Sequence, residues 1–243
     1  MKRFVHPSRE VLAEVLLAAG PDEPTLCAGW QTRHLAAHLV LREHSPLAAG
    51  IVAKPLAARF ERAVEELAAE SAGTAPYAAL VERFRSGPPR WSPLALPRVD
   101  NAANLVEFFV HTEDVRRAGE RWAPRVLDND YSEALWHSLV RGSRLLYRRS
   151  PVGIILVRPD GVRHVAKRAA SAVAVTGEPS ELLMHAFGRR GHALVTFEGT
   201  ADAIARLAAE GQGTKDQGTK GHDAGRRGSD GQGSTAGPRH RKG

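Results

Sequence analysis

The chain has 243 residues, and its 34 lysine and arginine residues against 27 aspartate and glutamate residues give a formal net charge of +7. Residues 211–243 hold seven of the basic and three of the acidic residues, so the rest of the chain carries a net charge of only +3, which does not by itself indicate nucleic-acid binding. The single cysteine, Cys27, excludes an intramolecular disulfide, and no run approaches the roughly 18 apolar residues of a membrane-spanning helix. We therefore expect a cytoplasmic protein without an export signal.

Apolar residues recur at helical spacing through most of residues 1–150, and no strand pattern is found there. Ser8 and Thr32 are expected to cap the first two helices, because their hydroxyl groups can accept from free backbone N–H groups. A proline-rich run at residues 87–97 indicates a loop. The expected helical stretches cover residues 8–19, 32–45, 56–69, 77–85, 101–118 and 130–147. This pattern predicts a bundle of four to five helices.

The pattern changes after Pro151, where β-branched and alternating apolar runs replace the helical spacing. We expect a domain boundary near residue 150 and a small α+β domain over residues 151–210. Its expected strands cover residues 154–157, 162–166, 173–176 and 193–197, and its expected helices cover residues 180–187 and 201–209.

Residues 211–243 contain ten glycines and no aromatic or branched aliphatic residue. Such a segment cannot bury enough surface to offset its conformational entropy, so we expect a disordered tail. We do not expect nucleic acid as a partner. Contact of this basic tail with RNA is the alternative interpretation, because clustered basic residues attract phosphates.

Glu107 and His111 are four positions apart, so they lie on one face of an expected helix. The positions around them are apolar, which indicates burial, and a buried carboxylate requires a cation or a strong hydrogen-bond donor. A divalent metal meets this requirement and also uses the imidazole, as in zinc sites that keep a position open for water or substrate. The alternatives are a simple Glu107–His111 ion pair and a Glu107 that faces solvent at the edge of the bundle.

His38 stands in a second apolar helical segment, Leu-Ala-Ala-His-Leu-Val, where it is either a core histidine or a further ligand. The longer segment Leu-Cys-Ala-Gly-Trp-Gln-Thr-Arg-His-Leu-Ala-Ala-His-Leu, at residues 26–39, resembles the N-terminal signature of the mycothiol-dependent maleylpyruvate isomerase family, in the DinB-like superfamily. Glu-Phe-Phe-Val-His-Thr-Glu-Asp-Val-Arg-Arg-Ala, at residues 107–118, resembles the second metal-binding helix of that family. The resemblance implies that His38, Glu107 and His111 are the protein ligands of one divalent metal, with zinc expected.

The resemblance extends to the C-terminal part of the chain. Thr-Gly-Glu-Pro-Ser-Glu-Leu at residues 176–182, with Phe-Gly-Arg at residues 187–189, resembles the sterol-carrier-like domain of the same family. It implies an actinobacterial-type protein with mycothiol, a low-molecular-weight thiol, as a cofactor. Arg189 is then the candidate catalytic residue that holds an acidic substrate or the thiol. Its alternative role is to complement the C-terminal end of a helix.

Three residues near the expected ligands have two interpretations each. His34, where the family usually has Asp, forms an i, i+4 pair with His38 and offers a competing ligand set, although we expect it on the outer face. Asp114 is expected either to orient a metal-bound histidine or to pair with Arg116. Cys27 is either a thiolate ligand or nucleophile or, as we expect, a small buried packing residue. Trp30 is expected to anchor its loop onto the bundle.

The function expected from these patterns is that of a thiol-dependent isomerase or transferase, in which a metal activates the cofactor thiol toward a small electrophile. The alternative is a metal-binding protein without catalysis, for storage, sensing or partner contact. The substrate, the identity of the metal and the oligomeric state are left open by the sequence.

Overall fold

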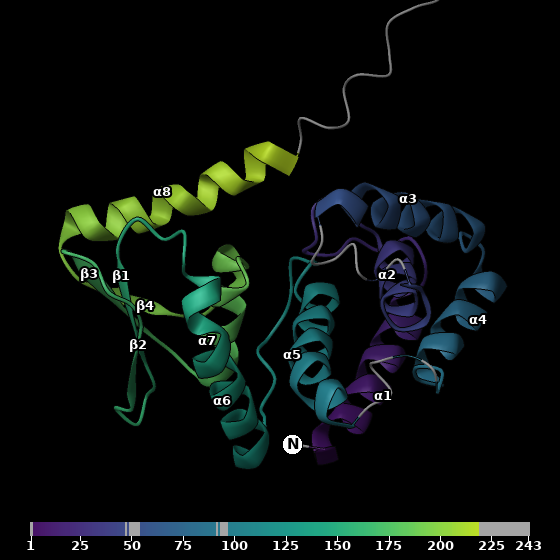
Figure 1. The fold of residues 1–243 in the computed structure, drawn as a ribbon, viewed down its shortest axis with the longest axis horizontal. Coiled ribbons are helices and arrows are strands. Elements are labelled where there is room, and N and C mark those ends of the chain that lie inside the picture. Colours follow the sequence, from purple (N-terminus) through teal and green to yellow (C-terminus); the bar gives the residue numbers. More distant parts are fainter. Residues whose placement is uncertain (1, 47, 49–53, 91, 93–96, 219–243) are drawn as a thin grey trace, which may run out of the picture.

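The computed structural model describes residues 2–46, 48, 54–90, 92 and 97–218. A helical region precedes a small mixed sheet with further helices (Figure 1). In chain order the elements are α1 (Lys2–Ala19), α2 (Thr32–His44), α3 (Lys54–Glu70), α4 (Thr74–Arg85), α5 (Pro97–Arg116), α6 (Asn129–Leu146), β1 (Gly153–Val157), β2 (Arg163–Lys167), β3 (Ala172–Thr176), α7 (Pro179–Ala186), the 3₁₀ turn η3 (Arg190–His192), β4 (Thr196–Glu198) and α8 (Ala201–Gly218).

Helices α1 to α5 form one side of the molecule (Figure 1). Helix α1 packs against α4 and α5, and α2 packs against α3 and α4. Leucines one turn apart, Leu12 and Leu16 on α1 and Leu35 and Leu39 on α2, are fully buried where these helices meet. The helical spacing of apolar residues therefore produces the bundle that it predicts.

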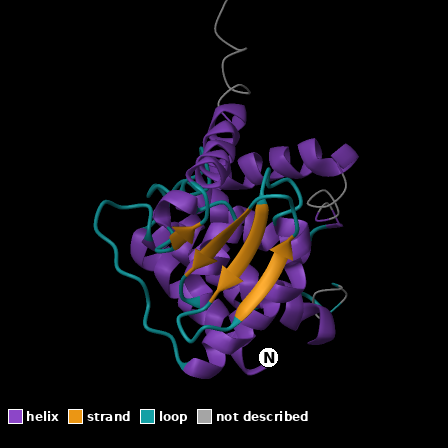
Figure 2. Cartoon of the chain, turned by 90° about the vertical axis from the view of Figure 1, so that its left-hand side faces the viewer, coloured by secondary structure: helices purple, strands orange, loops and turns teal. Residues whose placement is uncertain are grey.

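The C-terminal part is a four-stranded sheet with helices behind it, as Figure 2 shows. The strand order is β2-β1-β3-β4, with β1 and β3 parallel and the other two pairs antiparallel. Ile154 and Leu156 on β1 and Val173 and Val175 on β3 are fully buried, because alternate side chains of a strand share one face. The expected small α+β unit is thus confirmed, whereas its sterol-carrier-like identity stays a prediction.

Helix α6 packs mainly against α7 and β2, although it precedes residue 150. Figure 1 shows α6 beside α7 and the sheet, with α1 to α5 on the other side of the molecule. The boundary near residue 150 and the three domain ranges stay predictions. No helix among the described residues is long and apolar enough to cross a membrane.

Tertiary contacts correct both expected N-terminal caps. Helix α1 begins at Lys2 and not at residue 8. Ser8 therefore lies inside the helix, where its hydroxyl donates to the Phe4 carbonyl at 2.6 Å and lies 2.9 Å from the Tyr131 hydroxyl. The Thr32 hydroxyl donates to the Gly20 carbonyl in the preceding loop. Gln31 is the N-terminal cap of α2.

Element ends in the second half of the chain also differ from expectation. Helix α5 begins at Pro97, a residue type that suits a first helical position, and not at residue 101. Strand β4 covers Thr196–Glu198 and not residues 193–197, because only Thr196–Glu198 pair with β3 and residues 193–195 form a loop after η3. Helix α8 continues to Gly218, so residues 211–218 of the expected disordered tail are helical. Residues 219–243, and parts of the proline-rich run, lie outside the described residues.

A buried ion network joins α5 to α7 around Arg117, which is 1% exposed. Its Nε donates to Glu113 at 2.6 Å, and its two terminal nitrogens donate to Glu181 at 2.7 and 2.8 Å. Arg117 also donates to the His192 carbonyl at 2.6 Å. Buried charges are tolerated only when they are paired in this way, so the network connects α7 to the C-terminal end of α5.

Replacing Arg117 with leucine leaves the Glu181 carboxylate buried without its guanidinium partner. We expect Arg117→Leu to lower the free energy of unfolding by about 3 kcal/mol or more, measured by urea denaturation. The control is Arg206→Ala, which removes an exposed pair with Asp202 and is expected to cost less than about 1 kcal/mol. Equal losses in the two variants would contradict a special role for the buried network.

His185 is a buried histidine that is 1% exposed, and its Nδ1 atom lies 2.8 Å from the Tyr147 hydroxyl. Burial, with a smaller contribution from Arg190, lowers the pKa of His185 to about 4. Because the unfolded chain takes up this proton near pH 6.5, the stability associated with neutral His185 is complete above that pH and is lost as the pH falls toward 4. We expect His185 to lower the free energy of unfolding of the parent by about 2 to 3 kcal/mol between pH 7 and pH 4.5. His185→Gln lacks this titrating group, so its free energy of unfolding should depend less steeply on pH. Identical pH profiles would contradict it.

Candidate functional site

His38, Glu107 and His111 meet where α2 faces α5. The Oε1 atom of Glu107 lies 3.1 Å from His38 Nε2 and 3.2 Å from His111 Nε2. One donor atom from each residue lies within 4.8 Å of the others. The structure therefore brings together the three residues that the sequence singles out, although His38 lies 69 positions before Glu107 and still further from His111.

The local sequence of α5 explains why two of them face the same way. Glu107 and His111 are one helical turn apart. Leu105, Phe108 and Phe109, on the remaining faces, are buried in the core. The Glu107 side chain keeps 22% of its surface and the His111 side chain 11%, so the pair lies at the edge of the core and can meet a ligand.

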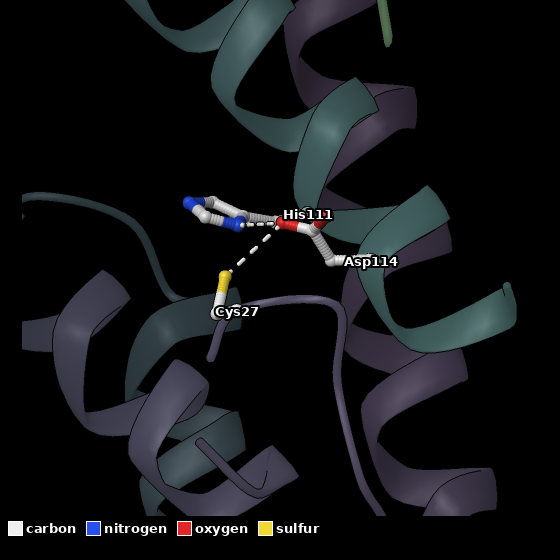
Figure 3. Close-up of side chains that lie close together, drawn as sticks. All are labelled: Cys27, His111 and Asp114. Carbon is white, nitrogen blue, oxygen red and sulfur yellow. Dashed lines mark hydrogen bonds and ion pairs between the residues drawn. The ribbon is translucent and has the colours of Figure 1, made fainter. Parts of the chain in front are cut away.

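Asp114 holds the far side of the His111 ring. Its Oδ2 atom lies 2.9 Å from His111 Nδ1, and its side chain is completely buried. Figure 3 shows this contact together with Cys27, whose Sγ atom lies 3.3 Å from the same oxygen. Of the two expected roles of Asp114, orientation of a histidine is the one that the structure has, because Arg116 pairs with Glu113 instead.

Arg189 reaches this cluster from just beyond α7, after Gly188 has turned the chain with a φ of +83°. Its Nε and Nη2 atoms donate to the two oxygens of Asp114 at 2.7 and 2.6 Å. The same Nη2 lies 3.3 Å from Cys27 Sγ. Arg189 therefore points toward the helical region, and Cys27 belongs to a polar cluster and is not the apolar packing residue that we expected.

Other neighbours complete the surroundings of His38 and Glu107. The Trp30 ring lies 5.2 Å from the His38 ring, so this residue covers the site as well as holding its loop. The Nε atom of Arg42 lies 3.5 Å from Glu107 Oε1. His34 lies apart from the cluster, with Nε2 3.4 Å from Glu65 on α3.

Arg42 and Trp30 were not assigned to the site from the sequence. Arg42 stands one helical turn after His38, and this spacing is the signal that could have found it. Trp30 lies in the loop before α2, and no periodicity relates a loop residue to a ring on the following helix. Its place over His38 depends on the path of that loop.

The charges of the cluster follow from burial and from its neighbours. Burial raises the pKa of Glu107, but His111, His38 and Arg42 outweigh burial and hold that pKa well below its usual range. Burial lowers the pKa of His111, yet Glu107 and Asp114 raise it well above the usual value of a histidine. Burial dominates for His38, whose pKa is lowered in spite of the nearby Glu107. Without a metal, these pKa shifts favour an anionic Glu107 with a protonated His111 and a neutral His38, and a metal bound at His111 would replace its Nε2 proton.

Among the residues that the structure describes, two overlapping groups of side chains could hold a metal ion: His38 with Glu107 and His111, and Cys27 with His111 and Asp114. The first group fits a metal better. Ligand atoms of a tetrahedral zinc ion are about 3.3 Å apart, since each lies about 2.0 to 2.1 Å from the metal, and the 3.1 and 3.2 Å separations are close to this value. In the second group both Asp114 oxygens already accept from Arg189.

Comparison with known proteins gives one family match. The profile of the mycothiol maleylpyruvate isomerase N-terminal domain family matches residues 6–129, from α1 to the first residue of α6. The matched segment contains His38, Glu107, His111 and Asp114, whereas Arg189 lies beyond it. No curated protein and no solved structure matches the chain. Because the match covers half of the chain, the protein belongs to the mycothiol maleylpyruvate isomerase N-terminal domain family.

Proposed function

We propose that the protein is a thiol-dependent metalloenzyme, an isomerase or transferase, that binds one divalent metal through His38, Glu107 and His111. The observation that carries the proposal is the Glu107 oxygen placed 3.1 and 3.2 Å from two histidine nitrogens, with Asp114 behind one of them. Membership of a mycothiol-related family supports a low-molecular-weight thiol, mycothiol, as the second cofactor.

Zinc is the metal that we propose. Two imidazoles and one carboxylate form a ligand set of zinc sites that keep a fourth position open. Competing metals such as Cu²⁺ bind nitrogen and oxygen donors more tightly, so occupancy also depends on metal availability.

Each residue of the cluster has a distinct part in the proposed chemistry. A divalent cation bound here supplies a Lewis acid that favours the thiolate form of a thiol at neutral pH. Asp114 accepts from His111 Nδ1 and so presents Nε2 to the site. We assign Arg189 as a positioning residue, in place of the catalytic role expected for it, because its Nε and Nη2 atoms hold Asp114.

The proposed reaction is addition of the cofactor thiol to a small electrophile. A new bond forms between the thiol sulfur and the electrophilic carbon of an activated alkene, the π bond of the alkene breaks, and the thiol proton ends on the neighbouring carbon. Reversal of this addition after bond rotation isomerises the alkene, and retention of the new bond completes a transfer. Both outcomes use one nucleophile and balance without an oxidant or reductant.

Metal content tests the site directly. We expect about one equivalent of zinc in the purified parent protein, and loss of the metal in His38→Ala and Glu107→Ala, measured by elemental analysis. Asp114→Asn should keep the site but weaken zinc affinity by roughly 10- to 100-fold, because the carboxylate that orients His111 is lost.

The matched control is His34→Ala, which removes a neighbouring histidine of the same helix that faces Glu65. This variant should retain the metal. If the parent stays empty after zinc addition, the cluster is an ordinary ion pair between Glu107 and His111. If His34→Ala loses the metal as completely as His38→Ala, the assignment of His38 and not His34 as the ligand is wrong.

Thiol dependence tests the enzyme. With mycothiol and a panel of activated alkenes, epoxides and alkyl halides, we expect turnover that requires both the thiol and the metal. Mass spectrometry of products should show at least a 100-fold loss of rate in Glu107→Ala and none in His34→Ala. A metal-loaded parent that accelerates no reaction of the panel would instead favour a non-catalytic metal-binding protein.

A further inference from the structure

An apolar cleft of about 490 Å³ opens onto the candidate metal site. It lies between α5, α6 and α7, and Figure 1 shows α5 facing the latter two helices across the molecule. Glu107 is one of its lining residues, so the cleft and the metal-ligand cluster share this side chain. The apolar lining residues are Val106, Leu139, Leu145, Leu146, Leu183 and Phe187.

The walls of the cleft differ in depth. Leu139 and Leu183 are fully buried and form its interior, whereas Leu145 is 64% exposed and lies toward solvent. Of the described lining residues, only Glu107 and Arg141 carry a charge. A volume of about 490 Å³ falls in the range of small-molecule sites.

We propose that this cleft holds the non-reacting part of the substrate, and that this part is an alkyl or aryl group. The inference rests on the proposed function, because it assumes that the reacting end of the electrophile lies at Glu107. A polar group placed against the leucine, valine and phenylalanine walls would lose its hydrogen bonds to water without replacement. An apolar group gains by leaving water, up to about fourfold in affinity for each buried methylene.

Helix α7 and the residues just after it contribute to both the apolar cleft and the ligand cluster. Leu183 and Phe187 line the cleft, and Arg189, two residues after Phe187, holds Asp114 behind His111. The position of α7 therefore shapes both the apolar wall and the support of the ligand cluster. The apolar wall from which we infer the substrate class therefore forms only when the C-terminal part is in place.

The test uses N-alkylsuccinimides from methyl to hexyl, which do not react with thiols, bound to the full-length metal-loaded protein without thiol. Calorimetry should show affinity rising two- to fourfold per methylene in the parent. Leu145→Asn places an amide on the cleft wall and should flatten this rise. Leu194→Asn, at another exposed leucine outside the cleft, is the matched control and should leave the rise unchanged.

A second variant tests occupancy of the same volume. A Cβ atom at Gly142 would meet only Leu146 Cδ1, at 3.7 Å, so a side chain is accommodated there, and leucine is a better helix former than glycine. Gly142→Leu should therefore fold, fill part of the cleft and weaken hexyl binding at least tenfold while methyl binding changes little. Affinity that is independent of chain length, or unaffected by both cleft variants, overturns the inference.

Metal analysis of the same samples separates the two proposals. A metal-loaded, thiol-active protein without chain-length dependence would retain the proposed function and refute the apolar substrate class. Chain-length dependence in a protein that binds no zinc would support the apolar cleft and refute the metalloenzyme.

Discussion

The fully buried carboxylate of Asp114 is the group on which the arrangement of the site depends. A carboxylate removed from water must be matched by donors and positive charge, and here His111 and Arg189 supply both. Its backbone carbonyl also accepts from the Leu26 N–H at 3.0 Å, which holds the Cys27 loop against α5. One residue thus fixes the imidazole, the loop and the end of α7 relative to one another.

The residues of α5 that form the site and attach the C-terminal part lie on one face of the helix. Glu107, His111, Asp114 and Arg117 follow at intervals of four, three and three residues, so they lie along a single face of the helix and its C-terminal end. The first two form the candidate ligand pair, the third orients a histidine, and the fourth binds Glu181 on α7. The candidate metal ligands and the residues that attach the C-terminal part therefore lie on the same helix.

The surroundings of the ligand cluster bear on whether the protein stores a metal or uses it in a reaction. A storage site requires ligands alone, whereas here a cleft lined by residues of α5, α6 and α7 reaches the ligand cluster at Glu107. Two histidines and one carboxylate also leave a coordination position open for an added ligand. Both features favour a site at which a small molecule meets an activated nucleophile.

The sequence by itself determined the parts of this protein that depend on regular spacing. The i, i+4 relation of Glu107 and His111 and the apolar segment around His38 indicated the candidate ligands, and the family resemblance selected them as one set. Helical periodicity predicted the positions of α2 to α6 closely. Only the tertiary structure decided the start of α1, the polar surroundings of Cys27 and the pairing of Arg189 with Asp114. The reason is physical: a helical period relates residues within one or two turns, whereas Arg189 and Asp114 are 75 positions apart and meet only because the tertiary fold brings the end of α7 to α5.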